Sequence, residues 1–282
     1  MLIIMKKNKI HFFTFGDSNF KLQKKHLIKL AEHSNFFDKI YSYSPKDIDK
    51  KFYQDFELVL KQKRGAGYWL WKYYFINKII ENSKRGDIVI YLDAGSSINF
   101  HAKKRYREYL DILNSSNFGS VSFKELDKNL EFKWTNKELL KYFQCENDKI
   151  LLNTPQINAS VLMFKNNKHT KNYLEEFIKT IIFDPYLITD KYQQNQNEGF
   201  IENRHDQSIS SIIKKIYGTH LLENENQFQE KIEKQYDFPF LTVRRKGYGI
   251  KDKINFNLFP NKFGKEIQYF ETSRKPRFRH NR

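Results

Sequence analysis

The sequence is poor in cysteine and has no long hydrophobic run. Cys145 is the only cysteine among 282 residues, which excludes a disulfide framework and a cysteine-based zinc or iron–sulfur site. No apolar stretch reaches the roughly 18 residues of a transmembrane helix. The apolar residues before the first lysines are too few for the core of a signal peptide. We therefore expect a protein that is made and kept in the cytoplasm.

Breaks in the chain are also sparse, because it has six prolines, eleven glycines, no internal repeat and no linker. Hydrophobic residues make up 39% and charged residues 29%, which is typical of a globular protein. The length suits one α/β domain with a full core. We predict a main domain over residues 1–243 and a basic C-terminal extension over residues 244–282, packed on the domain or trailing it.

The net charge of +17 is concentrated near the C-terminus. Residues 244–282 hold twelve Lys and Arg against three acids. Such a stretch favours a polyanionic partner, namely nucleic acid, an anionic membrane surface or a phosphorylated ligand. The alternative is a solvated basic tail. The sequence has no helix-turn-helix spacing, zinc knuckle or RNP-like strand, so we expect no specific nucleic-acid site.

Apolar runs alternate with amphipathic stretches along the chain, which predicts an α/β fold. A strand, a helix and a second strand at the start of the chain predict a βαβ unit, and hence parallel pairing. A polar, irregular stretch at 184–203 predicts a long loop of the kind that carries function. The expected strands are 10–15, 40–43, 88–92, 118–123, 157–164 and 240–243, and the expected helices are 20–32, 70–82, 102–113, 170–182 and 205–217.

Asp93 directly follows the buried run at 88–92 and precedes two small residues, Ala94 and Gly95. An acid at the carboxyl end of a buried strand lies where open α/β sheets bind ligands. Its carboxylate can hold a divalent cation against a diphosphate, and the small residues let a ligand approach the backbone. The alternative is an aspartate that only begins a turn or caps the next helix.

A second candidate segment combines glycine, aromatic and basic residues (RGAGYWLWK). Its two ends, Arg64 and Lys72, can neutralise a phosphate. Gly65 leaves room for a ligand near the backbone, and Tyr68 can stack on a base or a sugar ring. The alternative for the aromatic residues is ordinary core packing at the start of a helix.

Polar residues also stand out in two later segments. Asn158 and Ala159 interrupt an apolar strand, which indicates either close approach of a ligand or a buried, hydrogen-bonded asparagine. Asp206 is either the N-cap of the next helix or a carboxylate near a reacting carbon. Its neighbour His205 can bind a metal or donate to a phosphate.

In order along the chain, five segments resemble those of GT-A-fold glycosyltransferases: HFFTFGDS, RGAGYWLWK, GDIVIYLDAGSSI, PQINASVLMF and NRHDQSISSIIKKIYG. The similar enzymes use nucleotide sugars and belong to bacterial capsule and lipooligosaccharide loci. The resemblance covers roughly residues 9–220. It implies a Rossmann-type α/β fold with a mixed, mostly parallel sheet flanked by helices.

The resemblance places Asp93 on the first acid of an Asp-x-Asp motif, which binds a metal and the donor diphosphate, whereas Gly95 takes the place of the second acid. We expect Mn²⁺ or Mg²⁺ as the cofactor, with Asp93 and His205 as ligands. The resemblance implies that Asn158 and Asp206 contact the transferred sugar. The expected donor-binding residues are Arg64, Gly65, Tyr68, Lys72, Asp93, Ala94, Gly95, Asn158, Ala159 and Gln207.

The expected reaction moves a sugar from a nucleotide-diphosphate donor to a growing surface polysaccharide or lipooligosaccharide, with Asp206 as a catalytic carboxylate. An inverting transfer needs a second acid as base. No second acid stands out, although Glu202 is a candidate, so retention is favoured. The expected partners are the donor, a glycan or lipid-linked glycan acceptor, and the inner face of the plasma membrane through 244–282. The alternatives are a basic nucleic-acid-binding protein and a nucleotidyltransferase. The latter needs a Gly-rich basic loop where this chain has FGDSNF.

Overall fold

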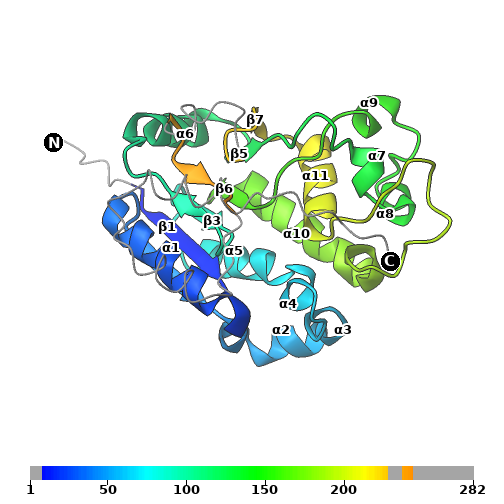
Figure 1. Cartoon of the computed structure of the whole chain (residues 1–282), viewed down its shortest axis with the longest axis horizontal. Helices are drawn as coiled ribbons and strands as arrows, with labels where there is room; N and C mark the ends of the chain where they lie inside the picture. The colour runs from blue at the N-terminus through cyan, green and yellow to red at the C-terminus, as the bar shows by residue number, and fades with distance from the viewer. Residues whose placement is uncertain (1–7, 228–236, 244–282) are drawn as a thin grey trace.

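The computed structural model describes residues 8–227 and 237–243 (Figure 1). The predicted extension 244–282 lies outside the described residues, and the domain boundary stays a prediction. The centre is a six-stranded sheet in the order β2-β1-β3-β6-β5-β7. Three of its strand pairs are parallel, and β6 runs antiparallel to both of its neighbours, so the sheet is mixed and mostly parallel, as predicted. The strands are β1 (Ile10–Phe15), β2 (Lys39–Tyr43), β3 (Ile88–Leu92), β5 (Ser120–Phe123), β6 (Val161–Lys165) and β7 (His220–Leu222).

The central strands are apolar at nearly every position because helices cover both faces of the sheet. Phe12 of β1 packs into the core on one face, with α1 (Lys21–Ser34) and α6 (Lys103–Ser115). Its neighbour Phe13 packs into the core on the other face. The helices on that face are α5 (Trp71–Glu81), α10 (Lys168–Phe183) and α11 (Asp206–Tyr217).

Shorter elements connect these helices and strands. Between β2 and α5 lie α2 (Lys50–Asp55), α3 (Glu57–Leu60) and α4 (Gly65–Tyr68). Between β5 and β6 lie α7 (Glu131–Trp134), α8 (Lys137–Tyr142) and α9 (Lys149–Leu152). The strands β4 (Ser97–Ile98) and β8 (Phe240–Leu241) form a separate antiparallel pair.

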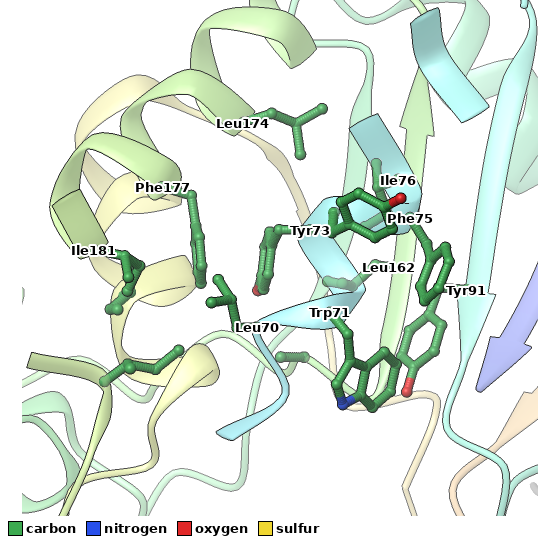
Figure 2. Packing of buried hydrophobic residues seen from close by; sticks show 14 of the residues in the cluster. Leu70, Trp71, Tyr73, Phe75, Ile76, Tyr91, Leu162, Leu174, Phe177 and Ile181 are labelled. Carbon is green, nitrogen blue, oxygen red and sulfur yellow. The ribbon is translucent and has the colours of Figure 1, made fainter. Parts of the chain in front are cut away.

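Aromatic packing fixes the start of α5 against its neighbours (Figure 2). Tyr73 stacks on Phe177 of α10, with ring centroids 3.5 Å apart. Trp71 stacks on Phe15 at the end of β1, with centroids 3.9 Å apart. Burial of side chains of this size stabilises the fold by about 1.5–3 kcal/mol each. Because Lys72 lies between these two aromatic residues in the chain, the same packing holds its backbone in place.

Two predicted strands differ from the structure. The predicted strand 157–164 begins only at Val161, because the Asn158 side chain accepts hydrogen bonds from the Ser160 backbone N–H at 2.8 Å and hydroxyl at 2.6 Å. This local turn takes the chain out of strand pairing. The predicted strand 240–243 is shortened to β8 and pairs with β4, outside the main sheet. The five predicted helices are confirmed with shifts of one or two residues at their ends.

Candidate active site

A cleft of about 660 Å³ opens at the carboxyl ends of β1 and β3. Gly16 and Asp17, which follow β1, form part of its lining, and so does the turn 93–96 that follows β3. This is the edge at which open α/β sheets bind ligands. The cleft brings together twelve of the predicted site residues: Arg64, Gly65, Lys72, Asp93, Ala94, Gly95, Asn158, Ala159, Glu202, His205, Asp206 and Gln207. Tyr68 lies behind this lining, where it packs on His205.

The Lys72 ammonium is buried at the floor of the cleft and is surrounded by oxygen atoms. Its Nζ lies 3.0 Å from Asp206 Oδ2, 3.4 Å from Asp93 Oδ1 and 3.0 Å from the Ala159 carbonyl oxygen. Burial alone would lower the pKa of Lys72, but the carboxylates of Asp206 and Asp93 outweigh it, and the pKa is raised. Lys72 is therefore a fixed cation at neutral pH, shared between two carboxylates.

Asp206 is the first residue of α11 rather than its N-cap, so the capping alternative is wrong. The N-cap is His205, whose φ of 59° and ψ of −120° turn the chain sharply into the helix. The turn leaves the Asp206 side chain only 5% exposed and directed at Lys72. Burial raises the pKa of Asp206 to about 6, although Lys72 acts in the opposite direction. Removal of the ammonium would thus leave a buried carboxylate without its counter-ion.

Asp93 is the more accessible of the two carboxylates, with its side chain 36% exposed. Its Oδ1 accepts a hydrogen bond of 2.6 Å from the hydroxyl of Tyr91, two residues earlier in β3. The phenol is buried, and this burial raises the pKa of Tyr91 well above its usual value, so the phenol stays protonated. Tyr91 and Lys72 together fix the orientation of Asp93 at the cleft surface.

These surroundings do not fit the expected metal centre. Asp93 Oδ1 already meets the Tyr91 hydroxyl and the Lys72 ammonium. His205, the second expected ligand, has its Nδ1 2.8 Å from the Ile188 carbonyl oxygen and its Nε2 3.7 Å from Asp190 Oδ1. Within residues 8–227 and 237–243, no three His, Cys, Asp or Glu side chains gather as a metal-binding group. The described donor set is thus that of an ammonium-centred cluster, not of a Mn²⁺ or Mg²⁺ site.

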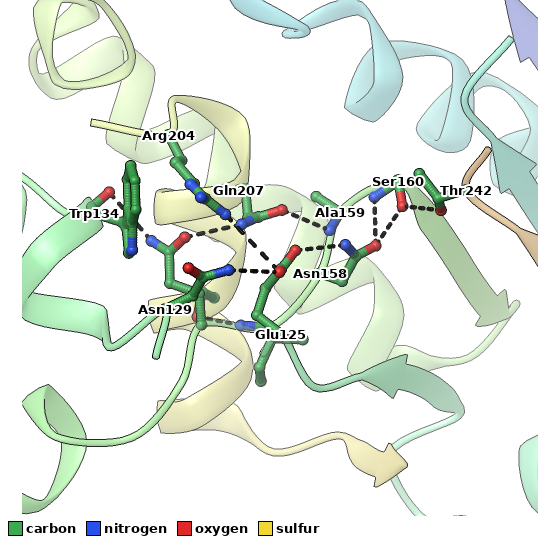
Figure 3. Close-up of polar contacts among 12 residues, drawn as sticks. Glu125, Asn129, Trp134, Asn158, Ala159, Ser160, Arg204, Gln207 and Thr242 are labelled. Carbon is green, nitrogen blue, oxygen red and sulfur yellow. Dashed lines mark hydrogen bonds and ion pairs between the residues drawn. The ribbon is translucent and has the colours of Figure 1, made fainter. Parts of the chain in front are cut away.

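A network of amides forms another part of the cleft lining (Figure 3). Asn158 donates from Nδ2 to Glu125 at 2.7 Å, while its Oδ1 accepts from Ser160 and from Asn226. Gln207 accepts from the Ala159 backbone N–H at 3.2 Å and donates to Gln156 at 2.9 Å. The Asn158 carbonyl oxygen is thus occupied by protein donors, and both amides are held in one orientation.

Arg64 lies at the cleft edge and is ion-paired with two acids. Its guanidinium contacts Asp190 at 2.8 Å and Glu202 at 3.3 Å. Asp190 also accepts a hydrogen bond of 3.0 Å from the Tyr68 hydroxyl. Burial acts to lower the pKa of Arg64, but Asp190 and Glu202 outweigh it, so the pKa is raised. The contacts of Arg64 and Tyr68 with Asp190 and Glu202 thus join the 64–68 segment to the polar loop that precedes α11.

The backbone between Arg64 and Trp71 is unusual. Five consecutive residues, Gly65 to Trp69, have positive φ values between 50° and 97°. Gly67 requires glycine for a second reason, because a Cβ there would lie 2.8 Å from Leu60 Cα. The three non-glycine residues each cost about 1–2 kcal/mol in this left-handed conformation. Strained backbone of this kind is concentrated at functional sites, which agrees with its place on the cleft wall.

No family model and no curated protein matches the sequence. Solved structures match its fold. The apo structure of WbbM, a bifunctional glycosyltransferase, superposes with a TM-score of 0.51 at 12% identity, and the match covers 94% of this chain and 52% of that chain.

The chain has a GT-A-like α/β fold. Two further solved structures have TM-scores below that of WbbM. The glycosyltransferase GlyE of Streptococcus pneumoniae TIGR4 has a TM-score of 0.43 at 16% identity, and the match covers 95% of this chain and 64% of that chain. The galactosyltransferase LgtC, in complex with donor and acceptor sugar analogs, has a TM-score of 0.44 at 10% identity. The match covers 93% of this chain and 95% of that chain. The chain therefore spans about 64% of the length of GlyE. At these identities the likeness establishes the fold alone.

Sequence reasoning missed Glu125 and Asp190. Glu125 is 3% exposed and lines the cleft, where it accepts from Asn158 and from Asn129. It follows β5 by two residues, so an acid placed just after a predicted strand was the available signal, as it was for Asp93. Asp190 lies in a polar loop whose composition gives no sign of its pairing with Arg64.

Proposed function

We propose that this chain is a glycosyltransferase that moves a sugar from a nucleotide-diphosphate donor to a glycan acceptor. The observation that carries the proposal is the cluster of Lys72, Asp93 and Asp206 at the carboxyl ends of the strands, in a cleft of about 660 Å³. Clefts of about 300–1,000 Å³ are typical of small-ligand sites. The fold shared with WbbM, itself a bifunctional glycosyltransferase, supports the same reading.

The charges of the cluster suit such a transfer. When the bond from the anomeric carbon to the diphosphate breaks, negative charge develops on the leaving oxygen, and a preorganised ammonium such as Lys72 stabilises it. The sugar gains oxocarbenium character, which the nearby carboxylates of Asp93 and Asp206 stabilise. Gln207 is held beside them by its bond to Ala159. We assign no step to a metal, since the described donor set does not fit one.

Retention at the anomeric carbon is part of the proposal. An inverting transfer needs a free carboxylate as base for the acceptor hydroxyl. Glu202, the candidate for that role, is ion-paired with Arg64 at 3.3 Å. Glu202 is therefore engaged by Arg64 and is not a free carboxylate.

The proposed acceptor is a growing surface polysaccharide or lipooligosaccharide, or its lipid-linked precursor. We place the protein in the cytoplasm, at the inner face of the plasma membrane. Among the described residues, the helices are either too short or too polar to span a bilayer. Attachment would therefore involve surface charge, and the basic stretch 244–282 supports this because each basic residue near an anionic surface contributes about 1 kcal/mol.

A thermal-shift panel tests the proposal. UDP, GDP, CMP and their common sugar conjugates are added to the full chain, each with EDTA or with Mn²⁺. A nucleotide at about 100 times its dissociation constant stabilises the folded state by about 2.7 kcal/mol, which is a clear shift in Tm. We expect one base to give this shift, with EDTA as well as with Mn²⁺. No shift with any nucleotide, together with salt-dependent binding of DNA or RNA, contradicts the proposal.

A further inference from the structure

A second cavity, of about 330 Å³, lies at the opposite end of the parallel strands from the cleft. It is formed where β1, β2 and β3 begin, and by the turn that follows α5. Lys9 precedes β1, Lys39 begins β2, and Asp87 precedes β3. The lining residues are Asn8, Lys9, His11, Lys39, Asn82, Ser83, Lys84, Arg85 and Asp87.

The cavity is strongly cationic. Four of its lining residues are exposed cations that form no ion pair within the described part of the chain: Lys9, Lys39, Lys84 and Arg85. Asp87 is the one acid in the lining, and its oxygens accept the backbone N–H groups of Lys9 at 2.9 Å and Lys84 at 3.0 Å. Asp87 therefore shapes the cavity wall, and within residues 8–227 and 237–243 it forms no ion pair with these four cationic side chains.

A buried histidine also contributes to the lining of this cavity. His11 is 2% exposed and lines the cavity. Its Nδ1 lies 3.1 Å from the Tyr41 hydroxyl, and its Nε2 lies 3.5 Å from Asp87 Oδ2. His11 and Asp87 together therefore form a buried polar part of the cavity wall.

We propose that this cavity is a second binding site, separate from the cleft, for a phosphate-bearing anion. Four cations against one acid suit a dianion better than a single carboxylate. The Arg85 guanidinium can bind two phosphate oxygens at once, and the lysines act as point charges around it. Asn8 and Asn82 add neutral amide groups to the lining, although the Asn82 amide already donates to the Lys78 carbonyl oxygen at 2.7 Å. The anion is either a soluble phosphate or the headgroup of an anionic lipid, which share this chemistry.

The test compares a double variant with a control of equal charge. Lys84→Ser combined with Arg85→Ser removes two cations of the cavity. Lys104→Ser combined with Arg107→Ser removes two exposed cations of α6, which lie outside the cavity lining. The full chain is titrated with inorganic phosphate, followed by ³¹P line broadening. It is also sedimented with vesicles of phosphatidylcholine, with or without phosphatidic acid.

The variant with Lys84→Ser and Arg85→Ser is expected to bind phosphate at least tenfold more weakly than wild type, because a hydrogen bond to a charged group contributes about 1.5–3 kcal/mol. The control is expected to stay within about twofold of wild type. Loss in the phosphate titration alone identifies a soluble anion, and loss with phosphatidic acid vesicles as well identifies a lipid headgroup. Equal losses in the two variants, or no binding of either probe by wild type, overturn the proposal. Nucleotide shifts in the cleft are expected to be the same in all three proteins.

Discussion

The start of α5 and the last turn of α11 each place a lysine in the interior, with opposite consequences. Lys72 and Lys214 are 3% and 2% exposed. Two carboxylates and a carbonyl surround Lys72, and its pKa is raised. Lys214 lies over the rings of Phe164 and Tyr173, and within the described residues its Nζ has no hydrogen-bond partner. Burial lowers the pKa of Lys214 to about 7.

The difference shows that burial alone does not mark a functional lysine. Lys72 keeps its charge only because Asp93, just after β3, and Asp206, at the start of α11, both approach it at the cleft. Lys214 is not part of the cleft lining and lacks such partners. We infer that Lys72 belongs to the active site and that Lys214 is a tolerated cost of packing α11 against β6 and α10.

The largest change in the free energy of unfolding is expected for Lys72→Met. The change leaves Asp206 buried without its counter-ion, and breaking a buried pair in this way costs about 3–5 kcal/mol of stability. Urea unfolding of wild type and variant measures the loss. The matched control is Lys78→Met on the same helix, where the half-exposed pair with Asp49 contributes at most about 1 kcal/mol. Similar small losses in both variants would contradict the distinction drawn for Lys72.

For Lys214→Met we expect a smaller change in the free energy of unfolding, and in the opposite direction. Methionine fills a similar volume and removes an unpartnered buried amine, so the free energy of unfolding should rise by about 1–3 kcal/mol at pH 7. The folded-state pKa of Lys214, about 7, lies below the usual value of 10.5. Between these values the unfolded chain binds more protons, so wild-type stability rises as the pH is raised.

Urea unfolding at pH 7, 8 and 9 checks this second change. The variant should lack the part of the wild-type rise that comes from Lys214, so the gain from the substitution should shrink as the pH increases. A loss of stability at pH 7, or a gain that is independent of pH, would show that Lys214 has a stabilising partner after all.

Local sequence predicted the parts of the site that depend on single strands. The buried run 88–92 correctly placed Asp93 at a strand end, and the expected helices around it are confirmed. By contrast, the predicted start of a strand at residue 157 was wrong, whereas the alternative of a buried, hydrogen-bonded Asn158 is confirmed. An apolar run of residues does not reveal that the asparagine side chain competes with strand pairing by bonding to Ser160.

Pairs between distant segments could not be predicted at all. Lys72 and Asp206 are 134 residues apart in the chain, and Arg64 and Asp190 are 126 apart. In the sequence, Lys214 and Lys215 look alike. Among the described residues, however, the buried Lys214 ammonium has no hydrogen-bond partner, whereas Lys215 is ion-paired with Glu131 at 2.6 Å. Only the packing of α11 decides which side each one faces.

The release of nucleoside diphosphate from the donor that the thermal-shift panel selects tests the central claim most directly. It is measured for wild type, for Asp93→Asn, and for Asp127→Asn, whose exposed carboxylate lies outside the cleft lining. We predict at least a hundredfold lower rate for Asp93→Asn, because removal of one preorganised electrostatic group at a reacting centre costs about 10²–10³ in rate. Its Tm should stay close to that of wild type, and Asp127→Asn should retain full activity. Release by Asp93→Asn at the wild-type rate would contradict the account.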